Sequence, residues 1–303
     1  MLRELENRGS KAEFSTVCRN HIAVLWHYAK SRSLIYIFPW ATFISVMIAS
    51  NGYPDPLTAG MAVGAGYLIM LAVYSYNDVV DLNVDRINAP NRPLVSGRVN
   101  KKELTRLIWI LNGSGLALAA MINIETLAVA SALVFLGIVY SHPRTHYRDI
   151  FPLKTLLTAT GAALVSLMGG LAMGNLSPYV IYAALVFFTF ECVLASLGDI
   201  HDVKGDRTVG RRTFPIVIGL RSTIAIMMMI CASLAMTAVA ISGIINISNT
   251  GLIMIIATCG IAVAVVRGLL HNHDNRIYVK NTRHVMRLVH VFLQLALFVG
   301  IIL

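Results

Sequence analysis

Long apolar stretches recur along this 303-residue chain, and they constrain its fold more than any other feature. A helix needs about 20 largely apolar residues to cross a bilayer. Nine stretches approach that length, at about residues 34–50, 56–77, 104–122, 124–141, 155–174, 177–198, 222–243, 250–270 and 284–303. Because backbone groups in lipid must bond within their own segment, these stretches predict transmembrane helices. We expect an all-α membrane protein.

The first stretch is short, and we expect its helix to extend back through residues 21–30 as a partly interfacial segment. Pro39 is expected to kink this helix, which packing in a bundle tolerates. Elsewhere, no polar or Gly/Ser-rich run is long enough to be a linker. The sequence therefore predicts a single domain over residues 1–303.

The connections between the stretches alternate in charge. Those near residues 51–55, 122–124, 174–177 and 242–249 contain no Lys or Arg, whereas the other connections and the N-terminal segment contain all 25. Basic connections mark the cytoplasmic side, so we expect the N-terminus inside and Leu303 outside. The net charge of +10 then predicts contact with anionic headgroups of the bilayer and no nucleic-acid partner. The absence of an Arg/Ser-rich leader favours a prokaryotic plasma membrane.

A cluster of aspartates follows the second stretch, in YSYNDVVDLNVDR at residues 74–86. Steps of three and four residues place Asp78, Asp81 and Asp85 on one face of a helix. This face lies where the predicted span meets a basic connection. We therefore expect these carboxylates at the cytoplasmic mouth of the helix bundle.

The segment GDIHDVKGDR, at residues 198–207, repeats this pattern with Asp199, Asp202 and Asp206. Each of the three lies 121 positions after its counterpart, and Arg86 and Arg207 share the offset. We interpret this as duplication of a four-helix unit. The halves would cover about 21–142 and 152–270, with a ninth helix at 284–303 left over.

Carboxylates so close together repel one another, so two facing clusters need cations. Carboxylate oxygens suit Mg²⁺, which typically combines one or two protein carboxylates with waters and substrate phosphates. We therefore expect all six aspartates to bind Mg²⁺ and, through it, a diphosphate. Metal and arginine would stabilise the charge on a departing diphosphate. The alternative, aspartates that only pair with arginines at a solvated helix end, is disfavoured by the duplication.

The motif NDxxDxxxD, which begins at Asn77, resembles the first motif of the UbiA superfamily of intramembrane prenyltransferases. The segment INAPNRPLVSGRV at residues 87–99 and the second motif, from Asp199 to Pro215, are also similar to sequences of this family. The resemblance covers nearly the whole chain. It implies nine helices around a central cavity, with both aspartate clusters binding Mg²⁺ and a polyprenyl diphosphate.

The resemblance also implies roles outside the aspartates. Asn77 would orient a carboxylate of the first cluster or contact the diphosphate. Arg92 and Arg212 would contact phosphate. His201, between two aspartates of the second cluster, points away from their face, and we expect it to be exposed.

Tyr140 belongs to a Tyr-Ser-His-Pro segment that resembles a Tyr-Ser-x-Pro sequence of the family. Its implied role is to stabilise an allylic cation or to position the diphosphate. The family usually has a Lys shortly afterwards, where this chain has Tyr147. Arg144, Arg148 and Lys154 are therefore all candidates for the missing basic group, and the two arginines could equally anchor headgroups.

Glu191 stands in the middle of the sixth stretch, where an isolated carboxyl is energetically expensive. Two interpretations remain open. Glu191 faces the cavity near the acceptor, or it is a protonated, hydrogen-bonded structural residue.

The expected reaction is transfer of a prenyl group from a polyprenyl diphosphate to a hydrophobic acceptor. The acceptor would be a quinone or chlorin precursor or a glycerol-phosphate lipid. A terpene cyclase of the same superfamily, which needs no acceptor, is the main alternative. A cation-coupled transporter is a second one, because transporters also combine internal repeats with intramembrane carboxylates. Against it, these carboxylates lie at helix ends and the repeat is parallel.

Overall fold

Helices make up all the regular structure of the described residues, 23–145 and 147–303, in the computed structural model. Expectations for the N-terminal segment up to residue 22 lie outside the described residues. Eight helical segments are long and apolar enough to cross a membrane: α3 (Pro56–Val80), α5 (Lys101–Ile122), α6 (Ile124–Ser141), α7 (Leu153–Ala172), α8 (Pro178–Thr208), α10 (Leu220–Ile241), Asn249–Asn272 and α13 (Arg276–Ile302). The segment Asn249–Asn272 comprises α11 (Asn249–Arg267) and α12 (Leu269–Asn272).

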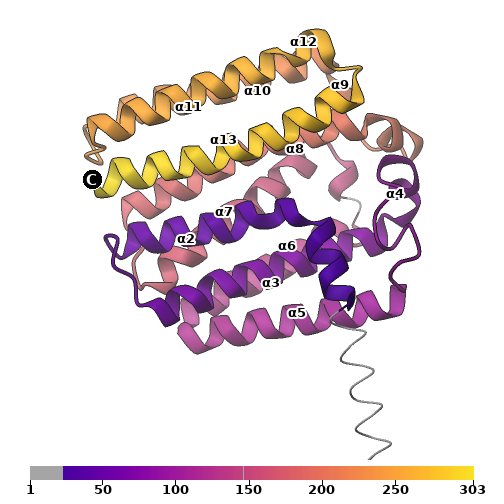
Figure 1. The fold of residues 1–303 in the computed structure, drawn as a ribbon, viewed down its shortest axis with the longest axis horizontal. Coiled ribbons are helices and arrows are strands. Elements are labelled where there is room, and N and C mark those ends of the chain that lie inside the picture. The colour runs from indigo at the N-terminus through magenta and orange to yellow at the C-terminus, as the bar shows by residue number, and fades with distance from the viewer. Residues whose placement is uncertain (1–22, 146) are drawn as a thin grey trace, which may run out of the picture.

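The remaining predicted span is α2 (Ile37–Ala49), a shorter apolar helix of 13 residues. Each of the nine predicted stretches thus has its helix, and the predicted all-α membrane fold is confirmed. Figure 1 shows the long helices lying alongside one another, with short elements gathered at one end of the bundle. These are α4 (Leu82–Asn88), α9 (Phe214–Val217) and α12. Basic connections lie at this end, and the C-terminus lies at the other (Figure 1).

The prediction that Pro39 kinks the first span is wrong. Pro39 lies in the first turn of α2, where its missing N–H has no intrahelical acceptor to lose. The chain instead breaks just before α2, at the 3₁₀ helix η1 (Ser33–Tyr36). Residues 23–31 form a separate helical segment before this break.

The helices fall into two series in the same order: α2, α3, α5, α6 and then α7, α8, α10, α11. The first members of the series, α2 and α7, pack against each other. Where they meet, Ser45 Oγ lies 2.7 Å from Ser166 Oγ, and these two positions are 121 residues apart. We propose that each series is one copy of a duplicated four-helix unit, which leaves α13 without a counterpart.

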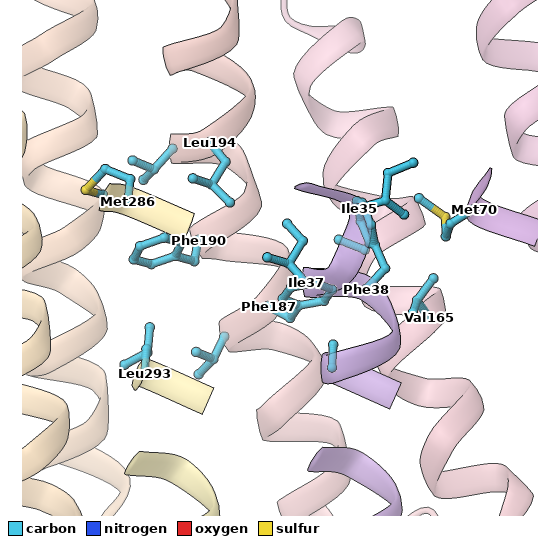
Figure 2. Packing of buried hydrophobic residues seen from close by; sticks show 14 of the residues in the cluster. Ile35, Ile37, Phe38, Met70, Val165, Phe187, Phe190, Leu194, Met286 and Leu293 are labelled. Carbon is cyan, nitrogen blue, oxygen red and sulfur yellow. The ribbon is translucent and has the colours of Figure 1, made fainter. Parts of the chain in front are cut away.

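Large apolar side chains join α2, α8 and α13 in the interior (Figure 2). The rings of Phe38 and Phe187 meet edge to face, with centroids 6.0 Å apart. Phe190, Met286 and Leu293 continue this cluster between α8 and α13. Because packing is a main source of helix association in lipid, this cluster fixes α8 between its two neighbours. It thereby positions the second aspartate cluster, at the end of α8.

Candidate active site

A cavity of about 560 Å³ opens at the end of the bundle that carries α4. Five of the six predicted aspartates line it, and so do Asn77, Arg92, Tyr140, Lys154 and Glu191. The sixth aspartate, Asp78, is 1% exposed and contacts Arg92, which lines the cavity. The fold therefore brings both predicted clusters to one site.

The spacing of the first cluster predicted one continuous helix, but the structure divides it between two helices. α3 ends at Val80 and α4 begins at Leu82, so that Asp81 caps both helices. Asn77 Nδ2 donates a hydrogen bond to Asp81 Oδ2 at 3.1 Å. The break turns α4 toward α8, against which it packs.

Two arginines hold the outer members of the first cluster. Arg92 Nη1 donates to Asp78 Oδ1 at 3.0 Å and also contacts Asp85. Arg32, at the break before α2, donates through Nε to Asp78 Oδ2 at 3.3 Å. Burial raises the pKa of Asp85 to about 6, although Arg92 opposes this shift. Both carboxylates are thus buried and neutralised by arginine.

The second cluster lies on the uninterrupted helix α8. Lys154 Nζ lies 2.6 Å from Asp199 Oδ1 and 3.2 Å from Asp206 Oδ2. Asp202 is the most accessible of the three, with a side chain 31% exposed, and its Oδ1 lies 2.6 Å from His201 Nδ1. The expectation that His201 is exposed is wrong, because its ring folds back onto Asp202 and is 14% exposed.

Arg211 joins the two clusters. Its Nη1 donates to Asp206 Oδ1 at 3.2 Å, and its Nη2 donates to Asp81. Its Nε donates to Asp149 Oδ1 at 3.1 Å. The neighbouring Arg212, predicted to contact phosphate, is exposed and does not line the cavity, whereas Arg211 does. One guanidinium therefore contacts a carboxylate from each half of the chain.

A tight contact between α4 and α8 supports this bridge. Asn88 Nδ2 donates to the carbonyl oxygen of Asp202 at 3.2 Å, and Gly205 N donates to Asn88 Oδ1 at 3.1 Å. A Cβ on Gly205 would lie 2.5 Å from the Asn88 side chain. Only glycine lets the two helices approach this closely.

The structure separates the basic candidates that follow Tyr140. Lys154 contacts the second cluster, and Arg148 Nη1 lies 2.8 Å from Asp81 Oδ1 in the first. Arg144 is exposed and does not line the cavity. Lys154 and Arg148 therefore stand where a basic group could contact phosphate.

Residues 38–288 match the model of the UbiA prenyltransferase family. The chain belongs to this family. The predicted family is thereby confirmed, and its name is that of prenyltransferases, not of transporters.

Curated relatives of this UbiA family member carry the name digeranylgeranylglyceryl phosphate synthase. Digeranylgeranylglyceryl phosphate synthase of Korarchaeum cryptofilum is 31% identical over 156 residues, which are 52% of this chain and 54% of the relative. The match thus spans about half of that relative's length. The synthase of the same name from Methanocaldococcus jannaschii is 27% identical over 268 residues, 86% of this chain and 89% of the relative.

A solved structure of a UbiA homologue from Archaeoglobus fulgidus, bound to DMAPP and Mg²⁺, has the same fold. Its TM-score is 0.63 at 18% identity, over 89% of this chain and 98% of that one.

The donor set of this UbiA site suits Mg²⁺. Among the described residues, no three His, Cys, Asp or Glu side chains converge into a closed metal cage. Mg²⁺ does not need one, because it is usually held by one or two carboxylates together with waters and substrate phosphates. Carboxylates that line an open cavity, with Asp202 partly exposed, fit that mode of binding.

A smaller apolar cavity of about 100 Å³ lies between α3, α6 and α7. Its walls include Met70, Leu133 and Leu136. It shares Tyr74 and Tyr140 with the walls of the aspartate cavity, so the two spaces adjoin at these rings. An apolar chain whose polar end is held by the aspartates could extend into this pocket.

Glu191 faces the aspartate cavity, as the first of its two interpretations expected. It is 4% exposed, and its Oε2 has no hydrogen-bond partner among the described residues. A carboxyl oxygen that is buried and unpaired next to a cavity is available to a bound molecule.

Sequence reasoning missed several cavity residues: Arg32, Arg211, Lys280, Arg283, His284 and Arg287. The four on α13 carried a signal, because steps of three and four place them on one helical face. The sequence nevertheless predicts the ninth span to start at residue 284, which leaves Lys280 and Arg283 in the preceding basic connection, whereas α13 starts at Arg276. Arg32 and Arg211 had no comparable spacing signal.

Proposed function

We propose that this protein transfers a prenyl group from a polyprenyl diphosphate to a hydroxyl of a glycerol-phosphate lipid and releases diphosphate. The observation that carries the proposal is the shared cavity, in which Arg211 contacts an aspartate of each cluster. The names of the curated relatives support a glycerol-phosphate acceptor. The Archaeoglobus homologue, by its DMAPP and Mg²⁺, supports a prenyl diphosphate donor.

The donor's diphosphate would lie between the two clusters. Their six aspartates would hold Mg²⁺, which neutralises charge on the departing diphosphate when bound. Lys154, Arg148 and Arg211 present N–H donors at the same place, and such preorganised donors stabilise developing negative charge. These contacts would promote cleavage of the bond between the allylic carbon and the diphosphate oxygen.

The prenyl chain would occupy the apolar cavity beyond Tyr74 and Tyr140. Both rings lie at the junction of the two cavities, where the allylic carbon would sit. Aromatic faces attract cations, and the apolar walls exclude water that would otherwise capture the allylic cation.

Glu191 would take the proton that the acceptor loses. In this step the hydroxyl oxygen of the acceptor bonds to the allylic carbon, the carbon–oxygen bond to diphosphate breaks, and the hydroxyl proton passes to the Glu191 carboxylate. The unpaired Oε2 of Glu191 at the cavity wall supports this assignment.

We place the mouth of the cavity at the cytoplasmic face. The connections at this end of the bundle carry the basic residues, whereas the connections at the other end carry none. The C-terminus would then lie outside. A prokaryotic plasma membrane remains a prediction.

Purified protein with Mg²⁺ and polyprenyl diphosphates of several lengths tests the proposal. Candidate acceptors are added or omitted, and products are identified by mass spectrometry. We expect adducts that require a glycerol-phosphate acceptor, together with diphosphate release that Asp202→Ala abolishes. A cyclic product formed without any acceptor would contradict transfer and support the terpene cyclase.

A further inference from the structure

The face of α13 that lines the active-site cavity carries a second group of cations. Arg283 and His284 lie three and four residues after Lys280, and Arg287 lies four and three residues after them. All four line the cavity. Lys280 and His284 are exposed at its rim, whereas Arg283 and Arg287 are half-buried. The helix that carries them is the one without a counterpart in the two series of helices.

These cations differ from those around the aspartates in forming no ion pair with another described residue. Arg32, Arg92, Arg148, Lys154 and Arg211 each form an ion pair with a cluster aspartate. Within the described part of the chain, neither Arg283 nor Arg287 forms an ion pair or a hydrogen bond. The Arg287 Nε and Nη1 atoms are moreover buried without any partner.

Unpaired guanidinium groups at this depth require an explanation. A buried donor without an acceptor is destabilising, and intramembrane charges mark binding sites by default. Guanidinium donors match phosphate oxygens in geometry and bind them in pairs. The missing partner is therefore an anion that enters the cavity.

The position of the pair distinguishes this anion from the donor's diphosphate. Arg283 Nη2 lies 4.0 Å from where a Cβ on Gly198 would stand, beside Asp199 of the second cluster. Arg287 lies one turn or about 6 Å further along α13. Three residues beyond Arg287, the ring of His290 stacks on Phe190, the chain neighbour of Glu191. The two arginines thus extend from the level of the second cluster toward the carboxyl that would receive the acceptor's proton. The donor's diphosphate has its own cations, those already paired with the aspartates.

We infer that Arg283 and Arg287 bind the phosphate of the acceptor and so select an anionic lipid acceptor. This inference rests on the proposed function and names the substrate class of the same site. The exposed Lys280 and His284 would attract the phosphate to the cavity mouth. A phosphate held by the pair would leave the acceptor's hydroxyl on the side of Glu191.

The test uses a prenylated glycerol phosphate and the same prenylated glycerol without phosphate. Acceptor binding, transfer kinetics and the Kd of a non-reactive prenyl thiodiphosphate are measured for wild type, Arg283→Gln, Arg287→Gln and Arg287→Lys. Arg267→Gln is the matched control, because Arg267 is exposed at the end of α11 and lies outside the cavity. An unchanged Kd for the donor analogue shows that a variant is folded.

We expect each glutamine variant to weaken binding of the phosphorylated acceptor by about tenfold or more, as for loss of a charged hydrogen bond. The unphosphorylated acceptor and the donor analogue should bind within about twofold of wild type. Arg287→Lys should restore part of the affinity, because it keeps the charge. Arg267→Gln should bind like wild type.

Unchanged binding of the phosphorylated acceptor in both glutamine variants would overturn the inference. So would loss of donor-analogue affinity with acceptor affinity intact, which would assign the arginines to the donor. Arginine-dependent binding of the phosphorylated acceptor without any transfer by wild type would support the site and refute the proposed function. Transfer by wild type, with acceptor binding that does not depend on the two arginines, would support the proposed function and refute the site.

Discussion

The two aspartate clusters have the same spacing but are held in different ways. The first lies across the break between α3 and α4, and each of its carboxylates is buried against arginine. The second lies on the continuous helix α8, where the Asp202 side chain is partly exposed and pairs with His201. Asp199 in the same cluster keeps an unpaired oxygen, Oδ2. A shared sequence pattern therefore does not imply a shared electrostatic setting.

This difference suggests a division of tasks. The first cluster is tied into the fold by charges that would be left buried and unpaired without it. The second cluster is also held by Lys154 and Arg211, but it presents the partly exposed Asp202 to a ligand. We expect substitutions in the first cluster to affect stability and activity together, and substitution of Asp202 to affect mainly activity.

The strongest contrast is expected between Asp78→Asn and Asp202→Asn. Both should lower the rate of prenyl transfer by more than about 100-fold. That is the largest loss typical of residues that only support a metal ligand, and these aspartates are proposed to be ligands themselves. Only Asp78→Asn should also destabilise the protein, by about 3–5 kcal/mol, because it leaves Arg32 without its buried partner and Arg92 with Asp85 alone. Transfer assays and thermal unfolding of the purified variants measure both effects. Equal stability of the two variants would remove the contrast between the clusters.

Arg211→Gln should disturb both clusters at once. It removes the one guanidinium that contacts Asp81 and Asp206, so we expect a loss of about 3–5 kcal/mol in stability and a large loss of transfer. Arg212→Gln is the neighbouring control, since Arg212 is exposed. If the two variants unfold at the same temperature, the bridge contributes nothing.

Mg²⁺ should stabilise the wild-type protein, by about 2.7 kcal/mol at a concentration of 100 times its Kd. Thermal unfolding with Mg²⁺ or with a chelator measures this shift. Asp202→Asn should diminish it, because Asp202 is the most accessible carboxylate of the second cluster. A full shift in Asp202→Asn would assign the metal to the first cluster alone.

Gly205→Ala should have the smallest effect, about 1–3 kcal/mol of destabilisation from overpacking. Its added methyl would press on Asn88 and move α4, with Asp85, away from α8. Gly198→Ala in the same helix is the control, because its methyl would meet no atom closer than 4.0 Å. An equal loss of stability in both variants, measured by thermal unfolding, would contradict the tight contact.

The sequence predicted the helices, the family and the aspartates because each depends on local pattern. Apolar length identifies a span, and the spacing of Asp78 or Asp199 repeats within a few residues. The contacts that complete the site depend on tertiary structure instead. No pattern separates Arg211 from its exposed neighbour Arg212, since only the packing of α4 on α8 decides which of them meets both clusters.

The break before α2 was equally hidden from the sequence. Pro39 lies close to this break but in the first turn of α2, so the helix is interrupted before it, at η1. Arg32, at this break, donates a hydrogen bond to Asp78. The basic face of α13 is visible as a spacing, but apolar length alone predicts the helix to begin at residue 284, whereas it begins at Arg276.

The central claim is that both clusters act on one diphosphate in one cavity. Calorimetric titration with a non-reactive prenyl thiodiphosphate, with and without Mg²⁺, tests it in wild type, Asp81→Asn and Asp206→Asn. The claim predicts one analogue bound per protein, a requirement for Mg²⁺, and a loss of affinity in both variants. Wild-type affinity in either variant, or two analogues bound per protein, would contradict it.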